Sequence, residues 1–270
     1  MMSHEILIRR AESVADYQAC QDAQRRAWGI TEESYVVPVA TMAGAQHHGG
    51  VVLGAFQRDG TAVGMSFGFL GRTDGRICLY SQLTGVVPDY QDQGIGGRLK
   101  AAQRAIAREE GIACIAWAFD PLQAGNARFN LEKLGARVGR YLENMYGFRT
   151  DALNRDTPTD RLIAVWETAD DPGMRRQSTD AIENTPRLIV GGEGPTFAGL
   201  ADAPRVLLEI PLEITALRQV SPAIAARWSL AVRQAFQSAF SAGYLGVGFH
   251  HHEGRGFYVL ECPCFDSGVE

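Results

Sequence analysis

The stretch from Val86 to Lys100 constrains the fold of this chain more than any other. An apolar run from Ile77 to Val87 predicts a strand, which Pro88-Asp89 ends, and an amphipathic helix is predicted to follow up to Glu110. A glycine-rich turn joins the two. Glycines let a ligand approach the backbone closely, and the unpaired N–H groups and dipole of a helix start attract anions. Because each such interaction is worth only ~0.3–1 kcal/mol, several amides must converge to hold a pyrophosphate.

The composition is typical of a globular protein with a sizeable core, since 46% of the 270 residues are hydrophobic and 21% are charged. No apolar run approaches the roughly 20 residues that span a bilayer, and the N-terminus lacks the features of a signal peptide. We therefore expect a cytoplasmic protein with no membrane partner. A net charge of −5 argues against nucleic acid as the main partner.

Cysteine and histidine patterns do not predict a metal site. The five cysteines show no zinc-site spacing, and their odd number fits a reducing compartment. We interpret Cys262-Pro263-Cys264 as a buried or inert pair rather than a metal or redox site. His47-His48 ends a predicted helix, and strand alternation keeps His250-His251-His252 from sharing one metal easily.

Hydrophobic periodicity predicts an α/β fold with a mixed sheet in residues 1–168. The elements are expected in this order along the chain: one strand, two helices, three strands, a helix, a strand, a helix and two strands. Asp-Gly turns at 59–60 and 74–75 predict an antiparallel meander. The strands are expected at Glu5–Arg10, Val51–Gln57, Ala62–Leu70, Ile77–Val87, Ile112–Phe119, Arg137–Tyr146 and Arg161–Glu167. The helices are expected at Val14–Trp28 after an N-cap at Ser13, at Val39–His47, at Gly96–Glu110 with Leu99, Ala102, Ile106 and Ala107 on its apolar side, and at Asn126–Leu134.

The remaining residues predict a linker and a smaller α+β extension. Residues 169–204 are rich in Asp, Gly, Pro, Thr and Arg, which indicates a loose connection with one apolar island, Leu188–Val190. The extension, residues 205–270, is expected to hold a strand at Arg205–Ile210, a helix from Ser221-Pro222 to Gly243, and a hairpin of Tyr244–Phe249 and Phe257–Leu260. One helix and three strands form a small folding unit, so we expect it to pack on the first part or to join two copies as a homodimer.

Gln91-x-x-Gly94-x-Gly96, at the junction of the fourth strand and third helix, resembles the signature of the GNAT superfamily of N-acetyltransferases. The preceding Val86-x-Pro88 and the later Lys133-Leu134-Gly135-Ala136, similar to the family's Lys-x-Gly-Phe corner, strengthen the resemblance. It covers roughly residues 5–168, and the whole chain resembles a bacterial subgroup with a C-terminal extension. A dinucleotide fold does not fit, because antiparallel strands precede the motif and the third glycine of Gly-x-Gly-x-x-Gly is missing.

The resemblance implies acetyl-CoA or another acyl-CoA as co-substrate. Its pyrophosphate would lie on the amides from Gln91 to Arg98, namely on Gln91, Gln93, Gly94, Ile95, Gly96, Gly97 and Arg98. The fourth and fifth strands would splay, so that Val86 and Val87 pair with the pantetheine arm through their backbone. Asn126 lies four residues before Asn130, on the same face of the predicted helix, and is a further candidate to line the cleft between the splayed strands. A helix cap and a surface position are the alternatives.

Acyl transfer to an amine needs a neutral amine, a stabilised oxyanion and a proton for the leaving thiolate. Asp120, which ends an apolar strand, is the candidate base or amine-binding group, with a turn aspartate before proline as the alternative. Where this chain has Leu131, many family members carry a tyrosine that acts as the general acid for the thiolate. Tyr141 and Tyr146, on the following strand, are candidates to replace it, and the alternative is that both are half-buried aromatic side chains of the sheet. Tyr80 and Gln82 are expected on one face of the fourth strand and Ser81 on the other, so only one set can face the acceptor.

These features predict an enzyme, an N-acyltransferase that moves an acetyl or succinyl group from CoA to the amine of a small molecule or amino acid. Direct transfer is expected, because no cysteine or serine has an obvious base beside it. Leu131 and the extension motivate the alternative of a CoA-binding or assembly module without catalysis.

Overall fold

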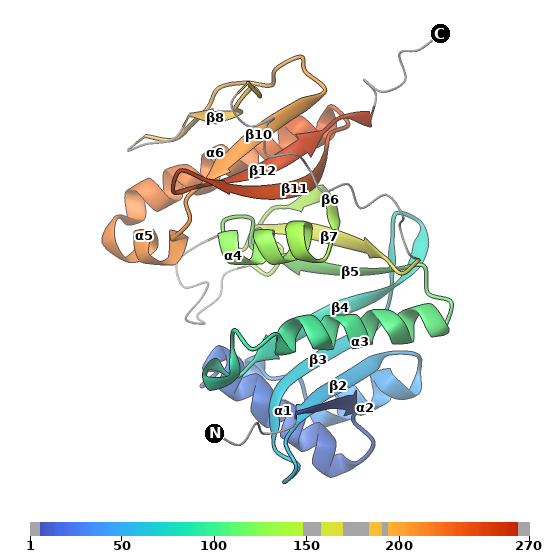
Figure 1. The fold of residues 1–270 in the computed structure, drawn as a ribbon. Coiled ribbons are helices and arrows are strands. Elements are labelled where there is room, and N and C mark those ends of the chain that lie inside the picture. The colour runs from blue at the N-terminus through green and yellow to red at the C-terminus, as the bar shows by residue number, and fades with distance from the viewer. Residues whose placement is uncertain (1–5, 148–157, 170–183, 191–193, 264–270) are drawn as a thin grey trace. The chain divides into compact units, whose positions relative to one another are not determined.

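The computed structural model describes residues 6–147, 158–169, 184–190 and 194–263 (Figure 1). The chain forms two compact units, of which the first comprises residues 1–117 and 167–170. The second comprises residues 118–166 and 171–270. Residues 118–166, which the sequence groups with the acyltransferase region, therefore belong to one unit with the C-terminal extension.

The first unit contains a five-stranded mixed sheet and three α-helices. Its elements are β1 (Leu7–Arg10), α1 (Val14–Trp28), the 3-10 turn η1 (Glu33–Tyr35), α2 (Val39–His47), β2 (Val51–Phe56), β3 (Ala62–Thr73), β4 (Arg76–Val86), the 3-10 turn η2 (Pro88–Tyr90), α3 (Ile95–Glu109) and the first residues of β5 (Cys114–Phe119). The strand order is β1-β2-β3-β4-β5. Neighbours from β1 to β4 are antiparallel, whereas β4 and β5 are parallel. The predicted meander and mixed sheet are confirmed.

Helices cover both faces of this sheet. Met65 and Phe67 of β3 belong to a buried cluster with Tyr17 of α1 and Met42 of α2. Gly64, which alternates with Met65, lies against α3, because a Cβ there would be 3.4 Å from Ile95 and Leu99 side chains. Hence α1 and α2 cover one face and α3 the other.

The buried face of α3 differs from the prediction. Its buried residues are Ile95, Leu99, Lys100, Gln103 and Ala107. Ala102 and Ile106, expected on the apolar side, are only half-buried. The prediction was wrong there because it counted apolar side chains alone, whereas the helix presents a lysine and a glutamine to the sheet.

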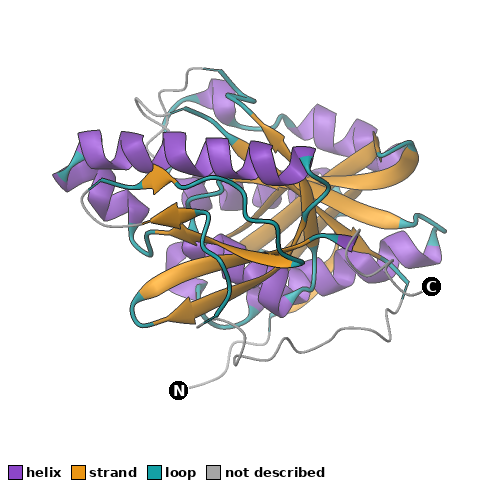
Figure 2. Cartoon of the chain, turned by 90° about the horizontal axis from the view of Figure 1, so that it is seen from above, coloured by secondary structure: helices purple, strands orange, loops and turns teal. Residues whose placement is uncertain are grey.

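The second unit contains an antiparallel sheet of order β7-β6-β11-β12-β10. Its elements are α4 (Ala124–Ala127), the π-helix η3 (Arg128–Lys133), β6 (Arg137–Leu142), β7 (Arg161–Glu167, whose last residue belongs to the first unit), β8 (Ile189–Val190), β9 (Thr196–Phe197), β10 (Arg205–Ile210), α5 (Ile214–Val220), α6 (Pro222–Ser241), β11 (Leu245–His252) and β12 (Arg255–Glu261). Figure 2 shows the helices and strands by colour.

The extension continues the sheet of residues 118–166, because Gly246 of β11 pairs with Val138 of β6. α6 buries Trp228, Val232 and Phe236, which lie four residues apart along one face of the helix, whereas Phe240 is half-buried. The hairpin strands run further than predicted, up to a tight turn at Glu253-Gly254 with φ of 48° and 74°.

Three other segments differ from the prediction. The helix expected from Asn126 begins at Ala124 and widens into a π-helix, in which Leu134 N donates to Phe129 O at 3.0 Å. The strand from Arg137 ends at Leu142, since Asn144 has a φ of 44°. The expected loose connection contains the β8–β9 hairpin, held by Leu188 N donating to Leu207 O at 2.7 Å.

Candidate functional site

The glycine turn presents the open start of α3. Gly94, with a φ of 74°, is the N-cap, and the first helical hydrogen bond runs from Arg98 N to Gly94 O at 3.0 Å. The amides of Ile95, Gly96 and Gly97 precede that bond and therefore have no partner within the helix. Gly94 is exposed, and Gly96 and Gly97 are half-buried. These donors and the helix dipole form a place where an anion can bind.

Packing within the chain does not explain the glycines of this turn. A Cβ at Gly96 would have its nearest neighbour, Val86 Cγ2, at 3.8 Å, and a Cβ at Gly94 would meet nothing within 4 Å. By contrast, a Cβ at Gly85 would lie 2.3 Å from the Trp28 ring. Gly85 is required by its neighbour, whereas Gly96 leaves space beside its amide. That space is not filled by neighbouring side chains of the described residues.

The end of β4 lies beside this turn and extends well past its pairing with β5. Cys78–Tyr80 pair with Cys114–Ala116, and β4 then runs on to Val86. In the described part of the chain, β4 pairs with β5 only from Cys78 to Tyr80, which fits the predicted splay. Val87 N donates to Val63 O at 2.9 Å and so belongs to the β3 side.

The side chains of the turn mostly hold its own backbone. Gln91 Nε2 donates to Val86 O at 3.0 Å, and Gln93 Nε2 donates to Asp89 O at 3.3 Å. Arg98 Nη2 donates to Ile6 O at 2.8 Å. Ile95 is buried and offers only its amide. Ligand contacts at this turn would therefore come from the backbone first.

Tyr80 belongs to the same unit. It is half-buried, and its ring lies 5.4 Å from that of Phe69. Its neighbour Ser81 is buried and accepts a hydrogen bond from Lys100 of α3, so Tyr80 points to the face opposite α3.

Asp120 belongs to the second unit, where it is engaged at both oxygens. Leu122 N donates to Oδ1 at 2.9 Å, and Arg218 Nη2 donates to Oδ2 at 3.1 Å. The first contact is the turn role that the sequence left open, and the second is an ion pair with α5. Asp120 as base or amine-binding group stays a prediction.

Tyr141 also lies in the second unit and donates to Asp160 Oδ2 at 2.6 Å. Arg233 donates to both oxygens of Asp160, each at 2.9 Å. Burial, with a further contribution from the Asp160 carboxylate, raises the pKa of Tyr141 far above its ordinary value. Tyr141 therefore holds its proton tightly and is a weak donor for a thiolate.

Asn130 and Leu131 are the buried residues of the π-helix η3. Leu131 is buried, with 3% of its surface exposed. Asn126 is exposed on α4, whereas Asn130 is buried on the π-helix, so the two do not share an exposed face.

Sequence reasoning missed Lys100. This residue is 4% exposed, donates to Ser81 Oγ at 2.8 Å, and places Nζ 4.0 Å from the centre of the Trp117 ring. Burial lowers its pKa to about 7. One signal was available: Lys100 and Gln103 lie three residues apart on the buried stripe of α3. A titratable group in such surroundings is a functional candidate.

The described cysteines of the first unit are not activated nucleophiles. Burial raises the pKa of Cys20 to about 12 and of Cys78 to about 11, and it also raises that of Cys114. Cys262 is buried, and Cys264 lies outside the described residues.

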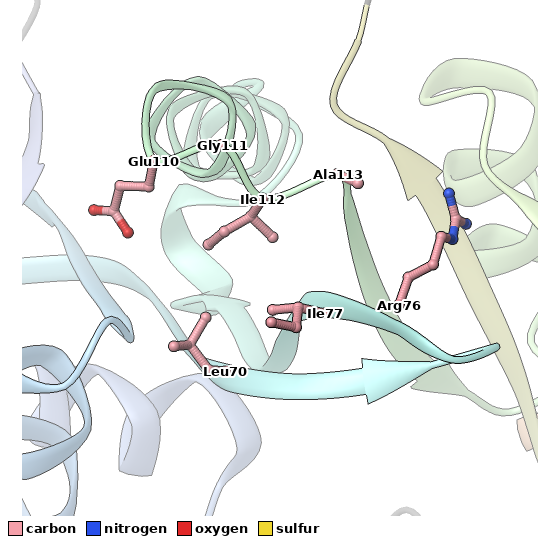
Figure 3. A pocket seen from close by; sticks show the side chains of 7 residues that line it. All are labelled: Leu70, Arg76, Ile77, Glu110, Gly111, Ile112 and Ala113. Carbon is pink, nitrogen blue, oxygen red and sulfur yellow. The ribbon is translucent and has the colours of Figure 1, made fainter.

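A depression of about 490 Å³ lies at the other end of α3 (Figure 3). Its lining is largely apolar, with Leu70, Ile77 and Ile112. Its two charged residues are engaged elsewhere, Arg76 with Glu167 and Glu110 with Arg10. It lies by the last residues of the helix, so it is separate from the glycine turn.

Among the described residues, no group of three His, Cys, Asp or Glu side chains is arranged to hold a metal ion. His47 and His48 are exposed at the end of α2, and His250–His252 lie along β11. None of the described helices combines the length and apolar character needed to cross a membrane.

No protein-family profile matches the sequence, and no curated protein is significantly similar to it. Solved structures do resemble it. A Desulfovibrio desulfuricans protein assigned to the GNAT family of acetyltransferases is 20% identical, covers 61% of this chain and all of its own, and has a TM-score of 0.47. The Escherichia coli ribosomal-protein-S18-alanine N-acetyltransferase is 19% identical, covers 63% and 98%, and has a TM-score of 0.47.

A Salmonella typhimurium protein assigned as an acetyltransferase, solved with its cofactor acetyl-CoA, is 19% identical, covers 62% of this chain and 96% of its own, and has a TM-score of 0.48. At these identities and scores the similarity carries no argument about activity or ligand.

Proposed function

We propose that the chain is an acyl-CoA-dependent N-acyltransferase that acts on the amine of a small molecule or amino acid, with acetyl or succinyl as the acyl group. The observation that carries the proposal is the open start of α3 beside the end of β4, which pairs with β3 but no longer with β5. The glycine turn supplies free amides for a pyrophosphate, and the β4 backbone supplies an edge for the pantetheine arm. The turn also has the family's sequence motif.

The raised pKa values of the buried cysteines support direct transfer from the thioester to the amine, without an acyl group on the enzyme. A thiol with a pKa of about 11 or 12 is almost wholly protonated at neutral pH, so Cys20 and Cys78 are poor acceptors of an acyl group. An α-amino group with a pKa near 8 costs only ~1 kcal/mol to neutralise at pH 7. Such an acceptor needs no strong dedicated base, although the leaving thiolate still needs a proton.

CoA affinity tests the site directly. We expect Gly96→Glu to weaken CoA binding at least tenfold in calorimetry, because a carboxylate would occupy the space beside the amide and repel phosphate. Gly44→Glu is the matched control, since Gly44 is an exposed helical glycine of α2 whose Cβ position is also open. Equal affinity for CoA in the two variants would contradict the proposed site.

Catalysis is tested by thiol release from acetyl-CoA and succinyl-CoA with a panel of amines and amino acids. An enzyme raises thiol release above background with at least one acceptor. The second candidate function is a CoA-binding module without catalysis. Leu131 favours it, because this apolar side chain stands where many GNAT members have the tyrosine that protonates the thiolate. Measurable CoA binding with silence across the whole panel would support that candidate.

A further inference from the structure

A group of polar side chains lies between α3 and the sheet of the first unit. We call it the polar seam: Ser66 of β3, Ser81 and Thr84 of β4, and Lys100 and Gln103 of α3. Four of the five are buried, and Thr84 alone is half-buried. Both amide atoms of Gln103 are buried and have no hydrogen-bond partner among the described residues. Polar groups are costly to bury, so a seam of this kind in a core calls for a functional reason.

The hydroxyl groups of the seam connect Lys100 to Thr84. Lys100 Nζ lies 2.8 Å from Ser81 Oγ, and Ser81 Oγ lies 3.5 Å from Thr84 Oγ1, the longest link. Ser66 Oγ, 2.9 Å from Thr84 Oγ1, is a side branch. Hydroxyls donate and accept at once, so such a chain can pass a proton.

A β-bulge creates this connection. Gly68 pairs with Ser81 and Phe67 with Leu83, so Gln82 is the extra residue of β4. Without a bulge, side chains three residues apart on a strand point to opposite faces. The bulge brings Ser81 and Thr84 to the same face, under α3.

Lys100 can take up and release a proton near neutral pH. Its pKa is lowered to about 7, and burial is the cause. Among the described residues, Ser81 and Trp117 contact the amine, and neither ionises in this range. Cys78 and Cys114 neighbour each other on β4 and β5, and alternation places Cys78 on the sheet face opposite Ser81.

We propose that Lys100, Ser81 and Thr84 form a relay that supplies the proton taken up by the leaving CoA thiolate. The inference rests on the proposed function. Thr84 is the seam's outlet: it lies in the part of β4 that has left β5 and two residues before Val86, where the pantetheine arm is proposed to run. The relay fills the role that Leu131 leaves vacant.

The proton balance of the step is complete. When the thioester carbon–sulfur bond breaks, the electron pair stays on sulfur, which takes the Thr84 hydroxyl proton. Thr84 takes the proton of Ser81, and Ser81 takes one from the Lys100 ammonium, which becomes a neutral amine. The proton lost by the acceptor nitrogen goes to solvent, and solvent returns one to Lys100. Lys100 does not touch the sulfur itself, because it supplies its proton through Ser81 and Thr84.

Lysine NMR tests the coupling without turnover, because the chain has only two lysines, Lys100 and Lys133. With ¹³Cε-lysine, we expect one signal to titrate near pH 7 and to shift its midpoint when CoA binds, and the exposed Lys133 signal to stay unchanged. In Thr84→Val, CoA should still bind, but the titration midpoint of Lys100 should be the same with and without CoA. Bound CoA with an unmoved wild-type midpoint would refute the relay alone. No CoA binding at all would refute the proposed function, and the relay with it.

The pH profile of acyl transfer provides the second readout. Lys100 must be protonated to donate, so wild-type kcat should fall as pH rises through about 7. Ser81→Ala, Thr84→Val and Lys100→Met should lose this fall and about 100-fold in kcat, with CoA affinity retained. Thr73→Val removes a buried hydroxyl of β3 that lies outside the seam, and it should keep the wild-type profile. A Thr84→Val profile equal to that of wild type would overturn the proposal, even if Lys100→Met fails to fold.

Discussion

Lys100 shows how one residue links stability to chemistry. Lys100 loses hydration in the core and has no carboxylate beside it among the described residues, so its charged form is disfavoured in the folded chain. Its apolar neighbours on α3 and the Trp117 ring replace only part of that hydration. The residue therefore destabilises the fold at neutral pH, as expected of a group retained for a role other than packing.

The pH dependence of stability follows from the sign of this shift. Below about pH 7 both states carry the proton, whereas between 7 and 10.5 only the unfolded state does, so stability rises with pH. We expect the free energy of unfolding of wild type, relative to Lys100→Met, to rise by roughly 1 kcal/mol per pH unit in that window. Urea unfolding at pH 6 to 10 measures it. A difference that does not change with pH would contradict a lowered pKa for Lys100.

At the scale of elements, helix ends were encoded locally. α1 begins with a capping box, in which Ser13 Oγ accepts from Asp16 N at 3.2 Å and Asp16 Oδ2 accepts from Ser13 N at 3.2 Å. It ends at Gly29, with a φ of 59°. These signals lie within a few residues of one another, and the predicted bounds of α1 and α2 are therefore confirmed.

Removing the cap of α1 should be measurable. Ser13→Ala leaves Asp16 N without its side-chain acceptor and should lower the free energy of unfolding by about 1 kcal/mol. Ser34→Ala, at an exposed serine of η1, is the control and should change it by less than about 0.5 kcal/mol. Equal effects of the two substitutions on chemical denaturation would mean that the cap does not stabilise the chain.

At the scale of the whole molecule, the extension is part of the second unit's sheet. A Cβ at Gly246 would lie 2.4 Å from Val138 Cγ2, at the junction of β11 and β6. Since a valine side chain has little freedom to move aside, this junction needs glycine. The strands β10, β11 and β12 therefore complete the sheet begun by β6 and β7.

Gly246→Ala tests whether the two units unfold separately. We expect it to destabilise the second unit by about 1–3 kcal/mol, through overpacking, and to speed hydrogen exchange in β6 and β11. Amides of β2 and β3 in the first unit should keep their protection. Gly125→Ala is the control, because its Cβ would meet nothing within 4 Å. Equal loss of protection in β2 and β3 would show that the units unfold as one.

The sequence by itself determined the meander, most helix bounds and the glycine turn, because periodicity, caps and turn glycines depend on neighbours a few residues away. Tertiary structure alone decided which polar side chains meet. Ser81 meets Lys100 across 19 residues, Asp120 meets Arg218 across 98, and Asp160 meets Arg233 across 73. Such contacts follow from the packing of distant elements and from the bulge at Gln82, which no local pattern of residues encodes.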